Sequence, residues 1–186
     1  MIKKLLESGL FRLKTLLIIS GFVITNFCYG QERNPTNINL ATSTYPKVTG
    51  YVGILHPIIT FTNAQTTTNF NNQYTVGLPT GINIIKSAKI GFSLEFVPLI
   101  KIENGVSRMN NFLFHPGVLF PVGKGFTLVG RAAFETSGRF GVTPVINKVV
   151  KKNENSKYYI AFPMPLRFGN DKPTSFTLGF QFGIAF

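Results

Sequence analysis

The sequence predicts an all-β protein, an eight-stranded antiparallel up-and-down transmembrane β-barrel. Eight runs alternate between large apolar residues and small or polar ones, as strands with two unlike faces do. A run of about 12 residues is enough to cross an apolar band of ~25 Å when tilted, whereas soluble strands usually have about 5–6. The chain contains 19 Phe and 18 Gly, with only 14% charged residues, a mixture that favours strands and turns over helices.

The first 30 residues have the features of a signal peptide. The chain starts with a basic segment that contains Lys3, Lys4, Arg12 and Lys14. An apolar run over 15–27 follows, and it is too short to span a membrane as a helix. Cys28 and Gly30 are small residues at the positions that a signal peptidase reads, so cleavage is expected after Gly30.

This division gives three parts: a signal peptide over 1–30, a flexible N-terminal lead over 31–46 and an outer-membrane β-barrel over 47–186. Four of the 19 basic residues and one of the 7 acidic residues lie in 1–30, which leaves a net charge of +9. An exported chain rarely meets nucleic acid, so the expected partner for this charge is outer-membrane lipid and not nucleic acid. The part after residue 30 has no cysteine and can form no disulfide.

The alternating runs, in order, are 47–61, 73–85, 88–96, 110–120, 125–135, 139–147, 157–168 and 175–186. The segments between them are rich in Gly, Asn, Pro and Ser, the residues that turns require. The first four segments, 63–72, 86–88, 103–108 and 122–125, alternate between long and short, as external loops and periplasmic turns of membrane barrels do. The last three, 136–138, 151–156 and 169–174, do not follow this alternation.

Six prolines inside these runs are difficult to place in a closed barrel. They are Pro79, Pro98, Pro116, Pro144, Pro163 and Pro165. Proline cannot donate to the strand ladder and is normally confined to edge strands or bulges, and a closed barrel has no edge. We therefore expect these prolines at bulges or beyond the bilayer.

The last run alternates most strictly. Its even positions from Phe176 to Phe186 are all large and apolar, and its odd positions are all small or polar. The final residues resemble the C-terminal assembly signal of outer-membrane barrel proteins, which Gln181, Gly183, Ile184 and Phe186 fill in order. The resemblance implies that the barrel-assembly machinery binds this strand.

Two further segments, 114–135 and 158–169, resemble small outer-membrane β-barrel domain proteins. There a strand with an internal Pro often precedes the last strand, and a Pro-Gly strand leads through a Gly-Lys turn into a Gly-rich strand. The resemblance covers about a third of the chain after residue 30. It implies the fold and the outer-membrane location but no particular activity, because fold does not fix function.

Charged residues also lie on the small, polar faces, which we assign to the barrel lumen. They are Lys89, Glu95, Arg131, Glu135, Arg139 and Arg167. The interior of an eight-stranded barrel is just wide enough for side chains to fill, and charges buried there must pair. Two interpretations remain open: a fixed salt-bridge plug that stiffens the barrel, or a gated narrow pore whose pairs exchange partners.

The sequence predicts no catalytic, cofactor-binding or metal-binding residues. The two histidines, His56 and His115, each precede a proline, and we interpret these pairs as marks of a strand bend or edge. A lipid A deacylase has a Ser two residues after its His, where this chain has Ile58 and Gly117. Two His and few acids give no ligand set for a metal.

The predicted function is therefore non-enzymatic. We expect an outer-membrane β-barrel protein with a structural role or an interaction role, in which loops such as 63–72 bind an extracellular partner. The alternative is a porin-like narrow pore or small-molecule transporter with a charged lumen. A third possibility is a soluble exported barrel that binds lipid.

Overall fold

The computed structural model describes residues 45–71 and 73–186, and they form an all-β fold. The strands are β1 (Lys47–Thr62), β2 (Thr66–Thr68), β3 (Gln73–Gly77), β4 (Thr80–Ile85), β5 (Gly91–Glu103), β6 (Val106–Gly123), β7 (Phe126–Glu135), β8 (Phe140–Lys152), β9 (Lys157–Pro163), β10 (Leu166–Phe168) and β11 (Ser175–Ala185). Within the described residues, no helix is long and apolar enough to cross a membrane. The predicted signal peptide and most of the predicted lead, residues 1–44, lie outside the described residues.

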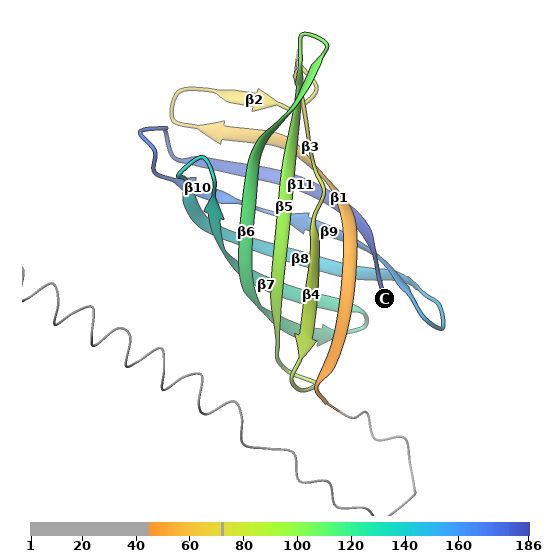
Figure 1. Cartoon of the computed structure of the whole chain (residues 1–186). Coiled ribbons are helices and arrows are strands. Elements are labelled where there is room, and N and C mark those ends of the chain that lie inside the picture. Colours follow the sequence, from red (N-terminus) through yellow and green to blue (C-terminus); the bar gives the residue numbers. More distant parts are fainter. Residues whose placement is uncertain (1–44, 72) are drawn as a thin grey trace, which may run out of the picture. The chain divides into compact units, whose positions relative to one another are not determined.

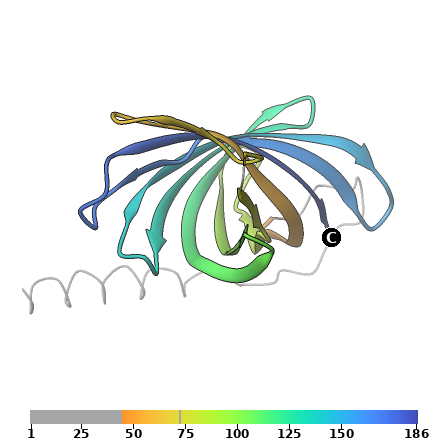
Figure 2. The ribbon, with the colours of Figure 1, turned by 90° about the horizontal axis from the view of Figure 1, so that it is seen from above.

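The strands close into a ring of eight antiparallel crossings. Figures 1 and 2 show these strands from the side and from above. The ring closes because β11 pairs with β1, from Tyr51 opposite Ala185 to Thr62 opposite Ser175. Two crossings are each built from two segments: β3 and β4 both lie between β1 and β5, and β9 and β10 both lie between β8 and β11. This topology confirms the predicted eight-stranded antiparallel barrel.

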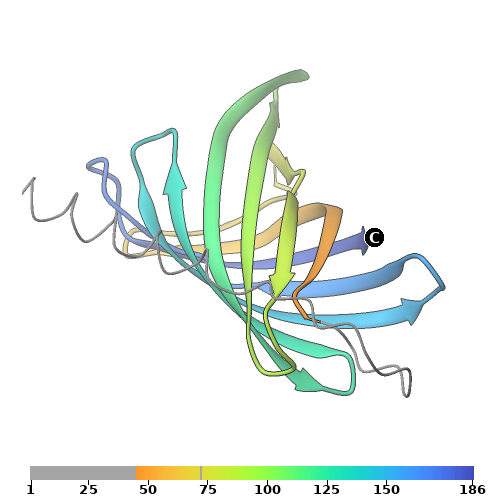
Figure 3. The same cartoon turned by 60° about the horizontal axis from the view of Figure 1, so that its bottom comes forward.

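The connections alternate between two ends of the barrel. The loop end carries the connections 63–72, 104–105, 136–139 and 169–174. The terminal end carries the first residue of β1, the last residue of β11 and the connections 86–90, 124–125 and 153–156 (Figure 3). β2 lies within the first connection and pairs with β1, so this predicted loop is partly a short hairpin.

The hairpin of β5 and β6 projects beyond the other strands at the loop end (Figures 1 and 3). The sequence predicted a loop over 103–108, and this prediction is wrong. Only Asn104 and Gly105 connect the two strands, with positive φ angles of 51° and 75°. An Asn-Gly pair with two positive φ angles makes a tight hairpin turn whose twist matches the strands, so the ladder continues almost to the tip.

The alternation of the sequence sorts side chains between the lumen and the outer surface. In β11, Phe176, Leu178 and Phe182 are 37–43% exposed, whereas Gly179 and Gln181 are buried. Even-numbered positions also face outward along most of the other strands, whose exposed side chains include Phe92, Phe96, Phe114, Phe120, Leu128, Phe134, Phe140 and Phe162. In β1 the register shift between Pro57 and Ile59 turns Phe61 outward instead. An outward surface with so many phenylalanines is the apolar band of a transmembrane β-barrel, because soluble proteins rarely expose a large contiguous apolar area.

Several of the six prolines do not lie where the sequence predicted them. Pro116 and Pro144 are inside β6 and β8, opposite Leu94 and Gly130. Pro79 and Pro165 fall in the gaps that divide β3 from β4 and β9 from β10, neither at a bulge nor beyond the strands. The gaps are bridged by backbone hydrogen bonds, since the Gly53 N–H donates to the Pro79 carbonyl at 2.9 Å and the Thr177 N–H to the Pro165 carbonyl at 2.9 Å. The carbonyl of each of these two prolines therefore still accepts a hydrogen bond. The ladder is interrupted only because proline has no N–H to donate.

The outward and inward faces can be separated by chemical labelling. In a Cys28→Ser background, we expect Phe182→Cys to react with a maleimide dissolved in the membrane and Gln181→Cys to be spared. Position 182 faces the outer apolar band, and position 181 is 5% exposed in the lumen. Labelling yields from the barrel in lipid vesicles would measure the difference. Equal reaction of both positions with a water-soluble maleimide would show that the outward face is not in a membrane.

Candidate functional site: a charge network in the lumen

At the centre of the lumen, the buried carboxylate of Glu95 contacts the guanidinium of Arg131 and the hydroxyl of Tyr51. Glu95 on β5 is 3% exposed, and its Oε2 lies 3.4 Å from Nη2 of Arg131 on β7. The hydroxyl of Tyr51 on β1 donates to the same oxygen at 3.0 Å, and Arg131 Nη2 lies 3.3 Å from Ser93 Oγ. Three strands therefore hold one ion pair, and each partner keeps further hydrogen bonds, as buried charges require.

His115 extends this pair into a longer network. Its Nδ1 lies 3.1 Å from Glu95 Oε1, and its Nε2 lies 3.0 Å from Nη2 of Arg167. An arginine has no acceptor, so Arg167 must donate and His115 Nε2 must accept. This geometry assigns the ring proton to Nδ1, which then donates to Glu95.

A second ion pair lies toward the loop end. Arg167 Nε donates to Glu135 Oε1 at 2.7 Å, a short charge-assisted contact. The other oxygen of Glu135 accepts from Asn111 Nδ2 at 2.6 Å and from the Ser137 hydroxyl at 2.9 Å. Two carboxylates and two guanidinium groups are thus joined through His115 into one charge-balanced chain.

The structure places the six predicted lumen charges unequally. It brings Glu95, Arg131, Glu135 and Arg167 together in the network. Arg139 lies beside it, with Nη2 donating to the Ser175 hydroxyl at 3.1 Å and to the carbonyls of Arg167 and Pro173.

Lys89 does not belong to the lumen, and its predicted position there is wrong. Its side chain is exposed in the connection 86–90 at the terminal end, because β5 begins only at Gly91. The alternation that predicted an inward position for Lys89 does not extend into a turn.

The sequence prediction missed His115, Tyr51 and Ser93. His115 was interpreted as the mark of a bend or edge, whereas its ring is 3% exposed inside the lumen. The signal that could have found these residues is parity, since 51, 93 and 115 are odd positions like 95 and 131. The other histidine, His56, bonds through Nδ1 to the Tyr74 hydroxyl at 2.8 Å and stacks on Phe182.

Glycines make room for the tyrosines of this layer. A Cβ on Gly81 would lie 2.6 Å from the Tyr51 hydroxyl, and one on Gly183 would lie 2.5 Å from the Tyr159 hydroxyl. Both approaches are closer than a carbon atom allows. The small residues of the inward faces therefore correspond to places where a neighbouring strand sends a large ring into the lumen.

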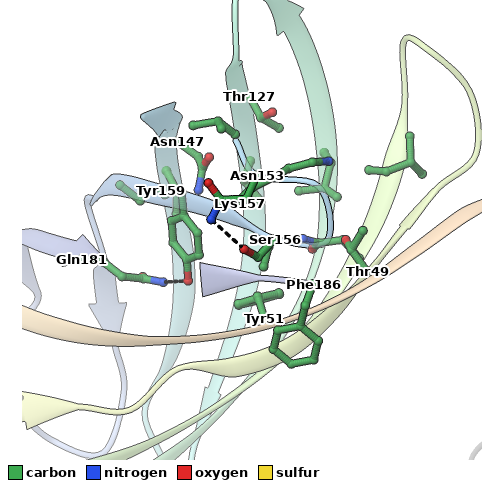
Figure 4. A pocket seen from close by; sticks show the side chains of 18 of the residues that line it. Thr49, Tyr51, Thr127, Asn147, Asn153, Ser156, Lys157, Tyr159, Gln181 and Phe186 are labelled. Carbon is green, nitrogen blue, oxygen red and sulfur yellow. Dashed lines mark hydrogen bonds between the residues drawn. The ribbon is translucent and has the colours of Figure 1, made fainter. Parts of the chain in front are cut away.

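The network divides the lumen into two cavities. One of about 300 Å³ opens at the terminal end and is lined by Tyr51, Tyr159 and Gln181, with a hydrogen bond of 3.0 Å between the last two (Figure 4). The other, of about 290 Å³, lies toward the loop end and is lined by Glu95, His115 and Arg167. Arg131 and Gln181 border both cavities, so one layer of side chains separates them.

The residues of the predicted assembly signal lie at the seam between β11 and β1. Gln181 and Gly183 face the lumen beside Tyr159, and Phe186 is 63% exposed. The backbone N–H of Phe186 donates to the Gly50 carbonyl at 2.9 Å, and the Gly50 N–H donates to the Phe186 carbonyl at 2.8 Å. Their recognition by an assembly machinery stays a prediction.

The network offers no obvious chemistry beyond structure. Both ring nitrogens of His115 are engaged, one by Glu95 and one by Arg167, so neither is left to activate a nucleophile. Among the residues that the structure describes, no group of three or more His, Cys, Asp or Glu side chains gathers to hold a metal ion. The prediction that the protein is not an enzyme remains a prediction.

Comparison with known proteins gives similarity of fold only. No family model and no curated protein matches the chain. Among solved structures, the chain is similar to a protein described under "De novo design of transmembrane beta-barrels", with a TM-score of 0.44, 11% identity, and coverage of 78% of this chain and 98% of that one. It is also similar to the de novo designed TMB2.3, solved by solution NMR, with a TM-score of 0.43, 12% identity, and coverage of 76% and 93%.

Removing the central carboxylate should destabilise the barrel far more than removing a surface one. We expect Glu95→Gln to lower the free energy of unfolding by ~3 kcal/mol, because Arg131 would be left buried without a counter-charge. The matched control is Glu103→Gln, whose side chain is 40% exposed and pairs with Lys101 at 3.0 Å. Its loss should stay within about 1 kcal/mol.

Urea unfolding of the micelle-bound barrel would measure both changes. Adding Arg131→Met to Glu95→Gln should recover part of the loss, since the unpaired charge is then gone. Equal effects of Glu95→Gln and Glu103→Gln would contradict the buried network.

Proposed function

We propose that the protein is a non-enzymatic outer-membrane β-barrel that acts through its loop end, as an anchor for an interaction with an extracellular partner. The projecting hairpin of β5 and β6 is the observation that carries this proposal. Near its tip Val106 is 64% exposed and Met109 67% exposed, and basic Arg108 stands between them. A long hairpin with exposed apolar and basic groups suits binding to another molecule better than it suits closing a barrel.

The lumen supports a structural role in place of transport. Its ion pairs, Glu95 with Arg131 and Glu135 with Arg167, lie 3.4 and 2.7 Å apart and are linked through His115. An ion that crosses the barrel would have to separate groups that are buried and already paired. We therefore favour the plug over the gated pore, the alternative function.

The location in the outer membrane is part of the proposal. It is supported by the apolar outward band, by the signal-like segment in residues 1–30 and by the C-terminal residues Gln181, Gly183, Ile184 and Phe186. The apolar band also weighs against a soluble lipid-binding barrel, whose outer surface would be polar.

The interaction role can be tested by photo-crosslinking in intact outer membranes. We expect a benzoylphenylalanine at position 109 to give a discrete crosslinked product, because this side chain projects from the loop-end hairpin. The control places it at position 122, which is 58% exposed at the terminal end. Products at both positions, or at neither, would count against recognition through the loop end.

The plug can be tested by conductance in planar bilayers. We expect the wild-type barrel to give no steady ion current and the variant Glu95→Ala/Arg131→Ala to give one, because removing both long side chains joins the two cavities. A control variant, Lys101→Ala/Glu103→Ala, removes a surface pair of 3.0 Å and should stay silent. A steady wild-type current would favour the pore.

A further inference from the structure

The two ends of the barrel differ strongly in charge. Eight lysines lie at the terminal end: Lys47, Lys86, Lys89, Lys124, Lys148, Lys151, Lys152 and Lys157. Among the described residues, Glu154 is the only acidic residue at this end. The lumen and the loop end together hold the other six basic and four acidic residues, so their charges nearly balance.

These lysines lie where the outward apolar band ends. In β8, Lys148 takes the next outward position after the exposed Ile146. Lys86 and Lys124 lie in the turns that follow the exposed residues Ile84 and Val122, and Lys151 pairs with the exposed Tyr158 at the end of β8. The lysines of the terminal end therefore lie close to where the exposed apolar band stops.

The loop end has the same border but lacks these charges. There the residues next to the ends of β7 and β11 are the uncharged Thr136 and Thr174. The lysines are thus not a feature of both ends of the barrel. They belong to one of the two lipid leaflets that the barrel meets.

Lys148 shows how such a side chain is held at this border. Its Nζ lies 4.0 Å from the ring centroid of Phe126, which is 41% exposed on the outer face. The same nitrogen donates to the Lys124 carbonyl at 2.6 Å. The apolar stem lies along the band while the charge stays at the polar boundary, the arrangement known as snorkelling.

We propose that this lysine rim, the eight lysines named above, is a binding site for the phosphates of anionic phospholipids in the leaflet at the terminal end. A mobile layer of lipid headgroups presents phosphates without fixed geometry, and the flexible, strongly hydrated lysine ammonium suits such a ligand better than the rigid guanidinium fork does. The rim contains no arginine. An acidic soluble protein would not need a lysine such as Lys148 to lie along the outward apolar band. The inference rests only on the membrane-spanning barrel of the proposed function, not on its loop partner or its plug.

The test compares lipid retention by two charge-matched variants. Barrels are placed in nanodiscs of equal parts phosphatidylglycerol and phosphatidylcholine, and the lipids that remain bound are counted by native mass spectrometry. One variant removes three exposed lysines of the rim, Lys124→Gln/Lys151→Gln/Lys152→Gln. The control removes three positive charges at the loop end, Lys101→Gln/Arg108→Gln/Lys172→Gln.

We expect the wild type and the control to retain phosphatidylglycerol in preference to phosphatidylcholine, and the rim variant to lose about fivefold in this preference for each lysine removed. The preference should also fall between about 0.1 M and about 1 M salt, because headgroup contacts are screened. Equal retention by the wild type and the rim variant would overturn the proposal. So would an equal loss in the control, which would indicate a response to net charge alone, or binding of soluble polyglutamate by the rim without any lipid preference.

Discussion

Every inward side chain of this barrel shares one narrow space, because β11 pairs with β1 and leaves no open edge. Charges buried in that space need partners on other strands, either a counter-charge or, as for Arg139, hydrogen-bond acceptors. The network from Arg131 through Glu95 and His115 to Arg167 meets this requirement with partners from β5, β6, β7 and β10. Closure of the ring thus dictates both where charges stand and which residues must stay small beside the tyrosines.

The network also ties the wall together across its width. Tyr51 lies on β1, and its hydroxyl meets Glu95 and Arg131 from strands that do not neighbour it. Backbone ladders hold each strand only to the next, so these side chains supply the contacts across the barrel. The two cavities on either side are what remains once this layer is in place.

Parity along a strand was enough to predict which face each residue takes, and therefore that Glu95, Arg131 and Arg167 point inward. It failed at Lys89, because side chains in a turn do not alternate between two faces as those of a strand do. His115 has inward parity as well, but the proline after it favoured a bend or an edge over a place in the network. Which inward charges pair depends on the register of strands far apart in sequence, and a single sequence does not contain that information. For the same reason, the prolines were recognised as interruptions but could not be placed between β3 and β4 or between β9 and β10.

The pairing of β11 with β1 has a consequence for the order in which the chain can fold. The hydroxyls of Thr60 and Thr177, 117 residues apart, meet across this seam at 2.9 Å. Contacts between such distant segments form slowly, because a long loop must close before any of them contributes. Until then both β1 and β11 present unpaired edges, which favour aggregation. Closure therefore waits until β11 meets β1, and a factor that covers the edge of β11 until then would lower the risk of aggregation.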